Sequence, residues 1–360
     1  MQTFVNKIAV VQAEPAWLDL EAGVIKTIEY IEEAAANGAK LLAFSELWIP
    51  GYPSWMWALN FANYHPINMK YIRNSMAIDS IEMNRIRAAC SENKIWVYLG
   101  FAERVGSSMW MSSCFIDGEG QITNHRRKIL PTACERIMFG NGTGDSLMNV
   151  ISTPLGRIGS LQCWEHLQPL LKYHTYSQHE QIHVAAWPAI FPHRGHEPWA
   201  FTAQAATVAS QLYAMEGQTF VLMATQVMTA KGAGMIGMST EGKGFDEAYT
   251  QIPGGGSSHI FGPDGKILAG PMAPHEEGIL YADADLGAIL DAKAYADPVG
   301  HYSRPDLLRV VVDREPKRPV IYLEEQKMPE HPSVTDDFSK VVDSLSRSSG
   351  LDVISANSME

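Results

Sequence analysis

The sequence is poor in cysteine, with 4 in 360 residues and no CxxC pair. Cysteines this scattered in a chain this long argue against a disulfide framework and against zinc bound through thiolates. Cys90 falls on an expected helix and Cys114 in an expected strand, so both are expected to lie in the core. Cys134 receives no catalytic role, and Cys163 stands apart because an apolar run ends at it and a polar, helix-like segment follows.

Basic residues and long apolar runs are also scarce. The net charge is −12, with 28 Lys and Arg against 40 Asp and Glu, which argues against nucleic acid or an anionic membrane as the main partner. No segment has the length of a membrane span, and residues 1–17 have the pattern of a first strand and not of a signal peptide. We therefore expect a cytoplasmic protein.

Apolar segments with strand and helix patterns alternate along the chain, so the expected class is α/β, with mixed sheets covered by helices. No linker interrupts this pattern before about residue 312, which predicts one domain over 1–315 and a polar tail over 316–360 that is interface-forming or partly disordered. The Gly- and Met-rich stretch 227–256 is expected to be a long loop. The expected helices are 19–36, 80–94, 205–218 and one that starts near Pro169; the expected strands include 41–44, 95–101, 157–163, 181–187, 219–225 and 277–286, with hairpins over 111–128 and 257–270.

Reactive side chains follow three of these strands. Glu46 comes after 41–44, Lys128 ends the first hairpin, and Cys163 ends the strand 157–163. In α/β sheets, functional residues gather where strands run into loops. A glutamate can act as a general base toward the thiol, and a lysine can stabilise negative charge that develops on a substrate. Together they predict covalent, acyl-type catalysis that needs no cofactor.

The segments around these residues resemble the carbon–nitrogen hydrolase superfamily, whose catalytic triad is Glu-Lys-Cys. The matching motifs are FSELWIPGYP (44–53), HRRKILPT (125–132) and LQCWEH (161–166), and TACER (132–136) supplies a second glutamate, Glu135. The segment DPVGHYSRPDLL (297–308) resembles the true nitrilase branch. The resemblance implies a four-layer α-β-β-α sandwich, catalytic roles for Glu46, Lys128, Cys163 and Glu135, and a homo-oligomer whose dimers assemble into spirals or filaments.

For a nitrilase, the resemblance implies that Cys163 attacks a nitrile carbon to give a thioimidate, that Glu46 transfers protons and that Lys128 stabilises the tetrahedral species. Ammonia and a carboxylic acid are the expected products, and arylaceto-, aromatic or aliphatic nitriles the expected substrates. Glu135 is expected to hold Lys128 or the substrate. Aromatic residues near the motifs could wall an apolar pocket, although at least half are expected to be core: Trp48, Tyr52, Trp55, Trp57, Trp164 and Trp187. The predicted substrate-binding residues are Tyr52, Trp164, Glu165, Trp187 and Pro188.

Other functions compete with this interpretation. A cyanide hydratase-like lyase would use the same triad and stop at the amide, and an amidase is disfavoured by the segment 297–308. HEQIH (179–183) fits the HExxH pattern of zinc proteases, but that pattern requires a helix and the segment leads into an expected strand, so no metal site is predicted. Arg126 and Arg127 are expected to be surface or structural residues, and His166 and His174 to be structural. A non-catalytic assembly protein is the remaining alternative.

Overall fold

The computed structural model describes residues 5–193, 195, 197–238 and 252–320. Contacts within the chain divide it into two units, Met1–Lys317 and Arg318–Glu360. Most of the second unit, and with it most of the predicted polar tail over 316–360, lies outside the described residues. The sheets, the helices and the candidate site all belong to the first unit.

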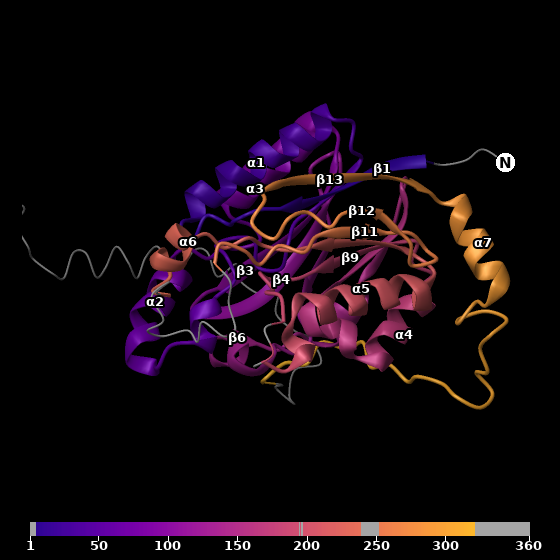
Figure 1. The fold of residues 1–360 in the computed structure, drawn as a ribbon. Coiled ribbons are helices and arrows are strands. Elements are labelled where there is room, and N and C mark those ends of the chain that lie inside the picture. The colour runs from indigo at the N-terminus through magenta and orange to yellow at the C-terminus, as the bar shows by residue number, and fades with distance from the viewer. Residues whose placement is uncertain (1–4, 194, 196, 239–251, 321–360) are drawn as a thin grey trace, which may run out of the picture. The chain divides into compact units, whose positions relative to one another are not determined.

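Two sheets form the centre of this unit (Figure 1). In the first sheet, β1, β2 and β3 run parallel, β13, β4 and β5 pair antiparallel with their neighbours, and β6 pairs parallel with β4. In the second, β8, β9 and β10 are the parallel centre. The first sheet has the order β13 (Gly278–Asp285), β1 (Val5–Gln12), β2 (Leu41–Ala43), β3 (Trp96–Val105), β4 (Ser108–Ile116), β5 (Ile122–Arg127), with β6 (Phe139–Gly140) paired to β4. The second has the order β12 (Ile267–Ala269), β11 (His259–Phe261), β10 (Phe220–Ala224), β9 (Ile182–Ala186), β8 (Gly156–Gln162), β7 (Val150–Thr153).

Helices cover the outer face of each sheet (Figure 1). The described residues form seven α-helices: α1 (Leu20–Ala36), α2 (Phe61–Arg73), α3 (Ile81–Asn93), α4 (Pro169–Ser177), α5 (Ala203–Gly217), α6 (Ala230–Met235) and α7 (Gly287–Tyr295). Short 3₁₀ turns are η1 (Ser54–Trp57), η2 (Ala133–Ile137), η3 (Gly144–Leu147), η4 (Cys163–Leu167) and η5 (Trp199–Phe201).

The alternation of side chains along β1 shows how the layers pack. Ile8 and Val10 face the core between the two sheets, whereas Ala9 and Val11 face the helices α1 and α3. This period of two is what a strand buried on both faces requires. A third core lies between the second sheet and α5, where Val221 packs near Tyr213. The predicted four-layer α-β-β-α sandwich is thus confirmed.

Local predictions were confirmed where the sequence carries a strong signal. Asn37 caps α1, and Gly38 follows it with a φ of +83°. Pro169 is the first residue of α4. The first hairpin turns at Asp117-Gly118. The stretch 227–256 is not a loop throughout, because Thr229 caps the short helix α6, and residues 239–251 lie outside the described part of the chain. Helix α2 was not predicted, since Pro66 lies inside it.

Candidate active site

The ends of β2, β5 and β8 bring the three predicted reactive groups together. Glu46 lies in the turn after β2, Lys128 directly follows β5, and Cys163 directly follows β8. The Nζ of Lys128 lies 2.8 Å from Oε1 of Glu46, and all three residues are buried. The Cys163 Sγ and carboxylate oxygens of Glu46 and Glu135 lie within 4.8 Å of one another. A thiol, two carboxyl groups and an ammonium therefore share one buried site.

Cys163 has a backbone conformation that few L-residues adopt. Its φ is +49°, in the left-handed region, at the first residue of η4. Glu165 fixes this turn, because its Oε2 accepts a hydrogen bond from the backbone N–H of Gln162 at 2.8 Å. Burial raises the pKa of the Cys163 thiol well above its usual value, and the nearby Glu46 adds to the effect. The side chain of Cys163 is therefore protonated at neutral pH, and a base must take its proton before it can react as a thiolate.

Lys128 is clamped between two carboxylates. Its Nζ donates to Oε1 of Glu46 and to Oε2 of Glu135, at 2.8 Å each. Burial alone would lower the pKa of the ammonium, but Glu135 and Glu46 more than offset this and hold the pKa of Lys128 well above its usual value. An ammonium has three N–H donors, so one is left for a substrate atom. The side chain of Lys128 is therefore protonated and carries a positive charge between the two carboxylates.

Glu46 has one free oxygen and a raised pKa. Burial raises the pKa of its carboxyl to about 8, against the pull of Lys128. Its Oε1 binds Lys128, whereas its buried Oε2 has no hydrogen-bond partner among the described residues. Gln226 holds its backbone, donating from Nε2 to the Glu46 carbonyl at 2.7 Å. A carboxyl with a pKa near neutrality and a free oxygen beside a thiol is suited to general-base catalysis.

Glu135 is the centre of a second set of hydrogen bonds. Its Oε2 accepts from the backbone N–H of Thr132 at 2.6 Å, and its Oε1 accepts from the Tyr52 hydroxyl at 2.7 Å. Trp57 Nε1 donates to that hydroxyl at 3.0 Å. The structure therefore brings Glu135 to Lys128, in the arrangement that the sequence analysis expected, and ties the cation to an aromatic wall through Tyr52.

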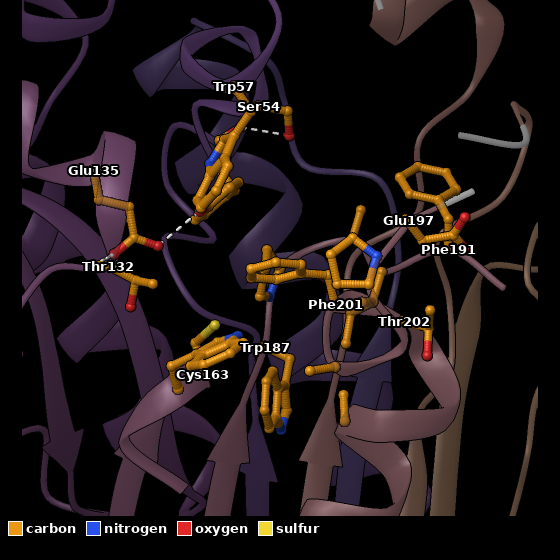
Figure 2. Close-up of a pocket in the computed structure, with 18 of the residues that line it drawn as sticks. Ser54, Trp57, Thr132, Glu135, Cys163, Trp187, Phe191, Glu197, Phe201 and Thr202 are labelled. Atoms are coloured by element: carbon orange, nitrogen blue, oxygen red, sulfur yellow. Dashed lines mark hydrogen bonds between the residues drawn. The ribbon is translucent and has the colours of Figure 1, made fainter. Parts of the chain in front are cut away.

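A cavity of about 470 Å³ opens beside Cys163. Figure 2 shows Cys163 and Glu135 at one end and Phe191, Glu197 and Thr202 at the other. Four predicted substrate-binding residues line it: Tyr52, Trp164, Trp187 and Pro188. Its size and its mostly apolar walls are those of a small-molecule site.

Glu165 is not among the described residues that line this cavity, contrary to the prediction that it binds substrate. Its two oxygens are taken by the buried Arg126 guanidinium, at 2.7 and 2.8 Å, and by the backbone N–H groups of Gln162 and Ile129. These contacts outweigh the effect of burial and lower the pKa of Glu165 to about 2. Arg126 is accordingly structural and not a surface residue.

The aromatic residues contribute more to the cavity than expected. Trp48 and Trp55 are core, but the other four of the six singled out line the cavity: Tyr52, Trp57, Trp164 and Trp187. Tyr52 and Trp187 are buried in the core as well, so the expectation that at least half of the six are core is confirmed. Phe201 was not predicted from the sequence; the centroid of its ring lies 5.1 Å from that of Trp164 and 6.4 Å from that of Trp57. Its place in the short turn η5 left no periodic signal to find it.

The HEQIH segment is not a zinc site of the protease kind. Its histidines do not share a helical face, because His179 lies in an exposed turn and His183 in the buried strand β9. Both ring nitrogens of His183 already have partners, His166 Nε2 at 3.0 Å and Glu180 Oε1 at 2.7 Å. The predictions for the other two histidines were right, since His166 and His174 bond the carbonyls of Cys163 and Leu147.

Comparisons with known proteins show the family to which the chain belongs. The carbon–nitrogen hydrolase family profile matches residues 7–294. The chain is 49% identical over 319 residues to an arylacetonitrilase of Aspergillus kawachii, covering 87% of this chain and 94% of that protein. It is 48% identical over 323 residues to a cyanide hydratase of Armillaria gallica, covering 89% of this chain and 88% of that protein.

A solved structure supports the fold. The crystal structure of a carbon-nitrogen hydrolase from Helicobacter pylori matches with a TM-score of 0.62 at 18% identity, covering 85% of this chain and 100% of that one. At this identity the match speaks for the fold alone, and the family rests on the profile and the curated relatives. The chain therefore belongs to the carbon–nitrogen hydrolase family, and within it to the nitrilase branch.

Proposed function

We propose that this enzyme is a nitrilase that hydrolyses an organic nitrile to a carboxylic acid and ammonia, with Cys163 as its nucleophile. The observation that carries the proposal is the meeting of Cys163, Glu46 and Lys128 at one end of an apolar cavity. The names of the relatives, arylacetonitrilase and nitrilase among them, support the nitrile as substrate. No cofactor enters the proposed reaction.

The first half of the reaction forms a covalent bond to sulfur. Glu46 takes the thiol proton, Cys163 Sγ attacks the nitrile carbon, and the nitrogen receives that proton to give a thioimidate. Glu46 is suited to this transfer because one of its carboxylate oxygens lies within 4.8 Å of the Cys163 Sγ, and its Oε2 has no hydrogen-bond partner among the described residues. Lys128 stabilises the negative charge that develops on nitrogen, with the N–H that its two carboxylates leave available.

The second half uses two water molecules. Glu46 deprotonates the first, which adds to the thioimidate carbon, and the tetrahedral species expels ammonia to leave a thioester. The second water hydrolyses the thioester, releasing the acid and the thiol of Cys163. Glu135 is the residue that positions Lys128 throughout, because it binds both the ammonium and the Thr132 backbone.

The walls of the cavity support a nitrile with an aromatic group. The rings of Trp57, Trp164 and Phe201 lie edge to face or tilted to one another and form one side of the cavity. Aromatic rings pack favourably in such arrangements with centroids about 4.5–7 Å apart. An arylacetonitrile places its nitrile carbon at the sulfur while its ring contacts this wall.

Product analysis on a panel of nitriles tests the proposal. Phenylacetonitrile, benzonitrile, an aliphatic nitrile and hydrogen cyanide are incubated with the enzyme, and acid, amide and ammonia are quantified. We expect acid and ammonia in equal amounts, greatest with the aryl substrates, and their loss in Cys163→Ala. Cys134→Ala is the matched control, because Cys134 is a free cysteine outside the cavity lining and is expected to keep its activity. A Cys163→Ala variant with undiminished turnover would refute the proposal.

A second candidate is the cyanide hydratase-like reaction, which the relative from Armillaria gallica favours. It differs in one step, since the tetrahedral species expels the thiol instead of ammonia and releases the amide. Amide without ammonia, chiefly from hydrogen cyanide, would assign this reaction.

We also propose that the chain works as a homo-oligomer whose dimers extend into spirals or filaments. Support comes from apolar side chains that are exposed on α4 and α5, among them Leu170, Val208, Leu212 and Met215. Sedimentation velocity of the full chain tests this.

Among the described residues, no helix is long and apolar enough to cross a bilayer. The cytoplasmic location stays a prediction.

A further inference from the structure

A chain of hydrogen bonds runs from the backbone of Cys163 into the second sheet. His166 Nδ1 lies 2.7 Å from the Cys163 carbonyl, and its Nε2 lies 3.0 Å from His183 Nε2. His183 Nδ1 lies 2.7 Å from Glu180 Oε1, and the Tyr213 hydroxyl donates to Glu180 Oε2 at 2.8 Å. All four side chains are buried. Glu180 and His183 belong to the HEQIH segment, to which neither the zinc interpretation nor the reaction assigns a role.

Hydrogen-bond chemistry fixes the protons along this chain. The Cys163 carbonyl can only accept, so His166 Nδ1 must carry a hydrogen and a neutral His166 accepts at Nε2. His183 must then donate from Nε2, which leaves its Nδ1 to accept from Glu180. Every bond is made if Glu180 and His183 together hold one proton between Oε1 and Nδ1. Each hydrogen bond from Glu180 to Cys163 is therefore donated in the same direction, and the last donor is the Nδ1–H of His166, which binds the Cys163 carbonyl.

The burial of these side chains favours the same placement of protons. Burial lowers the pKa of His166 to about 3 and lowers that of His183 well below its usual value, so both rings stay without extra charge. Burial also raises the pKa of Glu180 well above its usual value. Gly159 leaves the room for Glu180, because a Cβ at that glycine would collide with Oε1.

The hydrogen-bonded residues also contact the wall of the cavity. The ring of His166 stacks on that of Trp187, with centroids 5.3 Å apart and planes at 22°, and the ring of His183 stacks on Tyr213 at 3.8 Å and 24°. Trp187 lines the cavity. The stacking fixes the plane of the His166 ring, and the hydrogen bonds to Cys163 and His183 fix which nitrogen faces the Cys163 carbonyl.

We propose that Glu180 and His183 are positioning residues for the nucleophile, acting through His166 to hold the Cys163 backbone in its left-handed conformation. The inference rests on the proposed role of Cys163 as nucleophile. A φ of +49° is unfavourable for a cysteine and persists where the surroundings impose it. The carbonyl bond from His166 is one such restraint, and the chain behind it keeps the imidazole in the tautomer that donates.

Two variants of His166 separate this role from packing. In His166→Asn the amide nitrogen stands where Nδ1 was, and in His166→Gln it stands near the place of Nε2. We expect kcat of the Gln variant to fall by about 100-fold with KM nearly unchanged, since misplacing a reacting group by about 1 Å has that effect. The Asn variant is expected to retain at least about a tenth of the wild-type kcat, because it keeps the donor to Cys163.

Glu180 offers a second, matched pair. In Glu180→Gln the amide N–H replaces the shared proton toward His183 and the amide oxygen still accepts from Tyr213, so kcat is expected to stay close to that of the wild type. Glu180→Met, of similar volume, removes both bonds and is expected to lower kcat as His166→Gln does. The control is His174→Asn, which breaks a histidine bond to the Leu147 carbonyl, 3.1 Å long, without touching the chain. It should leave kcat unchanged.

Each variant is measured for kcat, KM, thermal midpoint and the rate at which iodoacetamide alkylates Cys163, read by peptide mass spectrometry. The alkylation rate should fall in step with kcat in His166→Gln and Glu180→Met. Equal kcat in the Asn and Gln variants of His166 would overturn the proposal, as would equal losses in Glu180→Gln and Glu180→Met. Alkylation that differs between the His166 variants, in an enzyme that turns over no nitrile, would refute the proposed function and leave the positioning role standing.

Discussion

The Arg126 guanidinium binds the Glu165 carboxylate through two parallel hydrogen bonds of 2.7 and 2.8 Å, and Glu165 lies in the same 3₁₀ turn as Cys163, the proposed nucleophile. Both side chains are buried, and the same carboxylate accepts from the backbone N–H groups of Gln162 and Ile129. It thus joins the turn that bears Cys163 to the segment that bears Lys128. One ion pair thereby connects the backbone next to the proposed nucleophile, Cys163, with the backbone next to Lys128.

Replacing Arg126 by Met should lower the free energy of unfolding by about 3–5 kcal/mol, because it leaves the Glu165 charge buried without its partner. Urea denaturation measures the change. The double variant Arg126→Met, Glu165→Met should recover part of that loss, since it leaves no uncompensated charge. The control is Arg304→Met, which breaks an exposed pair with Asp306 and should change stability little. A loss no larger in Arg126→Met than in this control would contradict the prediction.

The pH dependence of kcat/KM should report the carboxyl of Glu46. Its pKa is raised to about 8, and the proposed base is its ionised form. The active fraction therefore grows as pH rises toward 8, and below that value kcat/KM should fall by about tenfold per pH unit. Initial rates with a nitrile that does not ionise give the profile. A flat profile from about pH 6 to about pH 9 would contradict the assignment of Glu46 as the base.

Gln226 should prove to be a residue that positions Glu46. Gln226→Met removes the donor to the Glu46 carbonyl, and kcat should fall by about tenfold while stability falls by about 1–3 kcal/mol. Gln12→Met is the matched control, because Gln12 is also a buried glutamine whose amide donates to carbonyls, those of Ala273 and Glu276. It should lower stability by a similar amount and leave kcat unchanged. Equal effects of the two substitutions on kcat would count against a positioning role.

The sequence was sufficient to predict the groups that lie at strand ends. Glu46 and Cys163 each follow a buried apolar strand, and Lys128 follows the polar second strand of a hairpin. Functional groups gather where strands run into loops, so these three could be grouped from the sequence. The helices with clear periodicity and caps, such as α1, were also predictable. Helix α2 was not, because Pro66 lies in its interior and tertiary contacts stabilise it despite that residue.

Roles set by long-range contacts could not be predicted. Glu165 stands two residues from the nucleophile and has the chemistry of a substrate ligand, but Arg126, 39 residues away in sequence, takes both of its oxygens. The cavity wall depends likewise on Trp57 and Phe201, which come from separate 3₁₀ turns. HEQIH was correctly placed at a strand, yet its role depends on His166 lying against it.

The proton shared by Glu180 and His183 should be visible in the pH dependence of stability. The folded pair holds it, whereas the unfolded chain releases it above the ordinary glutamate pKa of 4.5. A group whose pKa is raised on folding stabilises the protein fully below its unfolded pKa, and this contribution is lost as pH rises. Glu180→Gln has no such proton to lose. The free energy of unfolding of the wild type, relative to this variant, should therefore decrease with rising pH.

The expected slope of that difference is about 1.4 kcal/mol per pH unit for one proton, between about pH 5 and about pH 7. Urea denaturation of both proteins at several pH values measures it. Other groups that titrate in this range, including Glu46, His166 and the surface histidines, are common to both proteins and cancel in the difference. A slope of zero would mean that the folded pair holds no extra proton. His166 would then lack the donor that fixes its tautomer, and the chain of hydrogen bonds could not direct an N–H to Cys163.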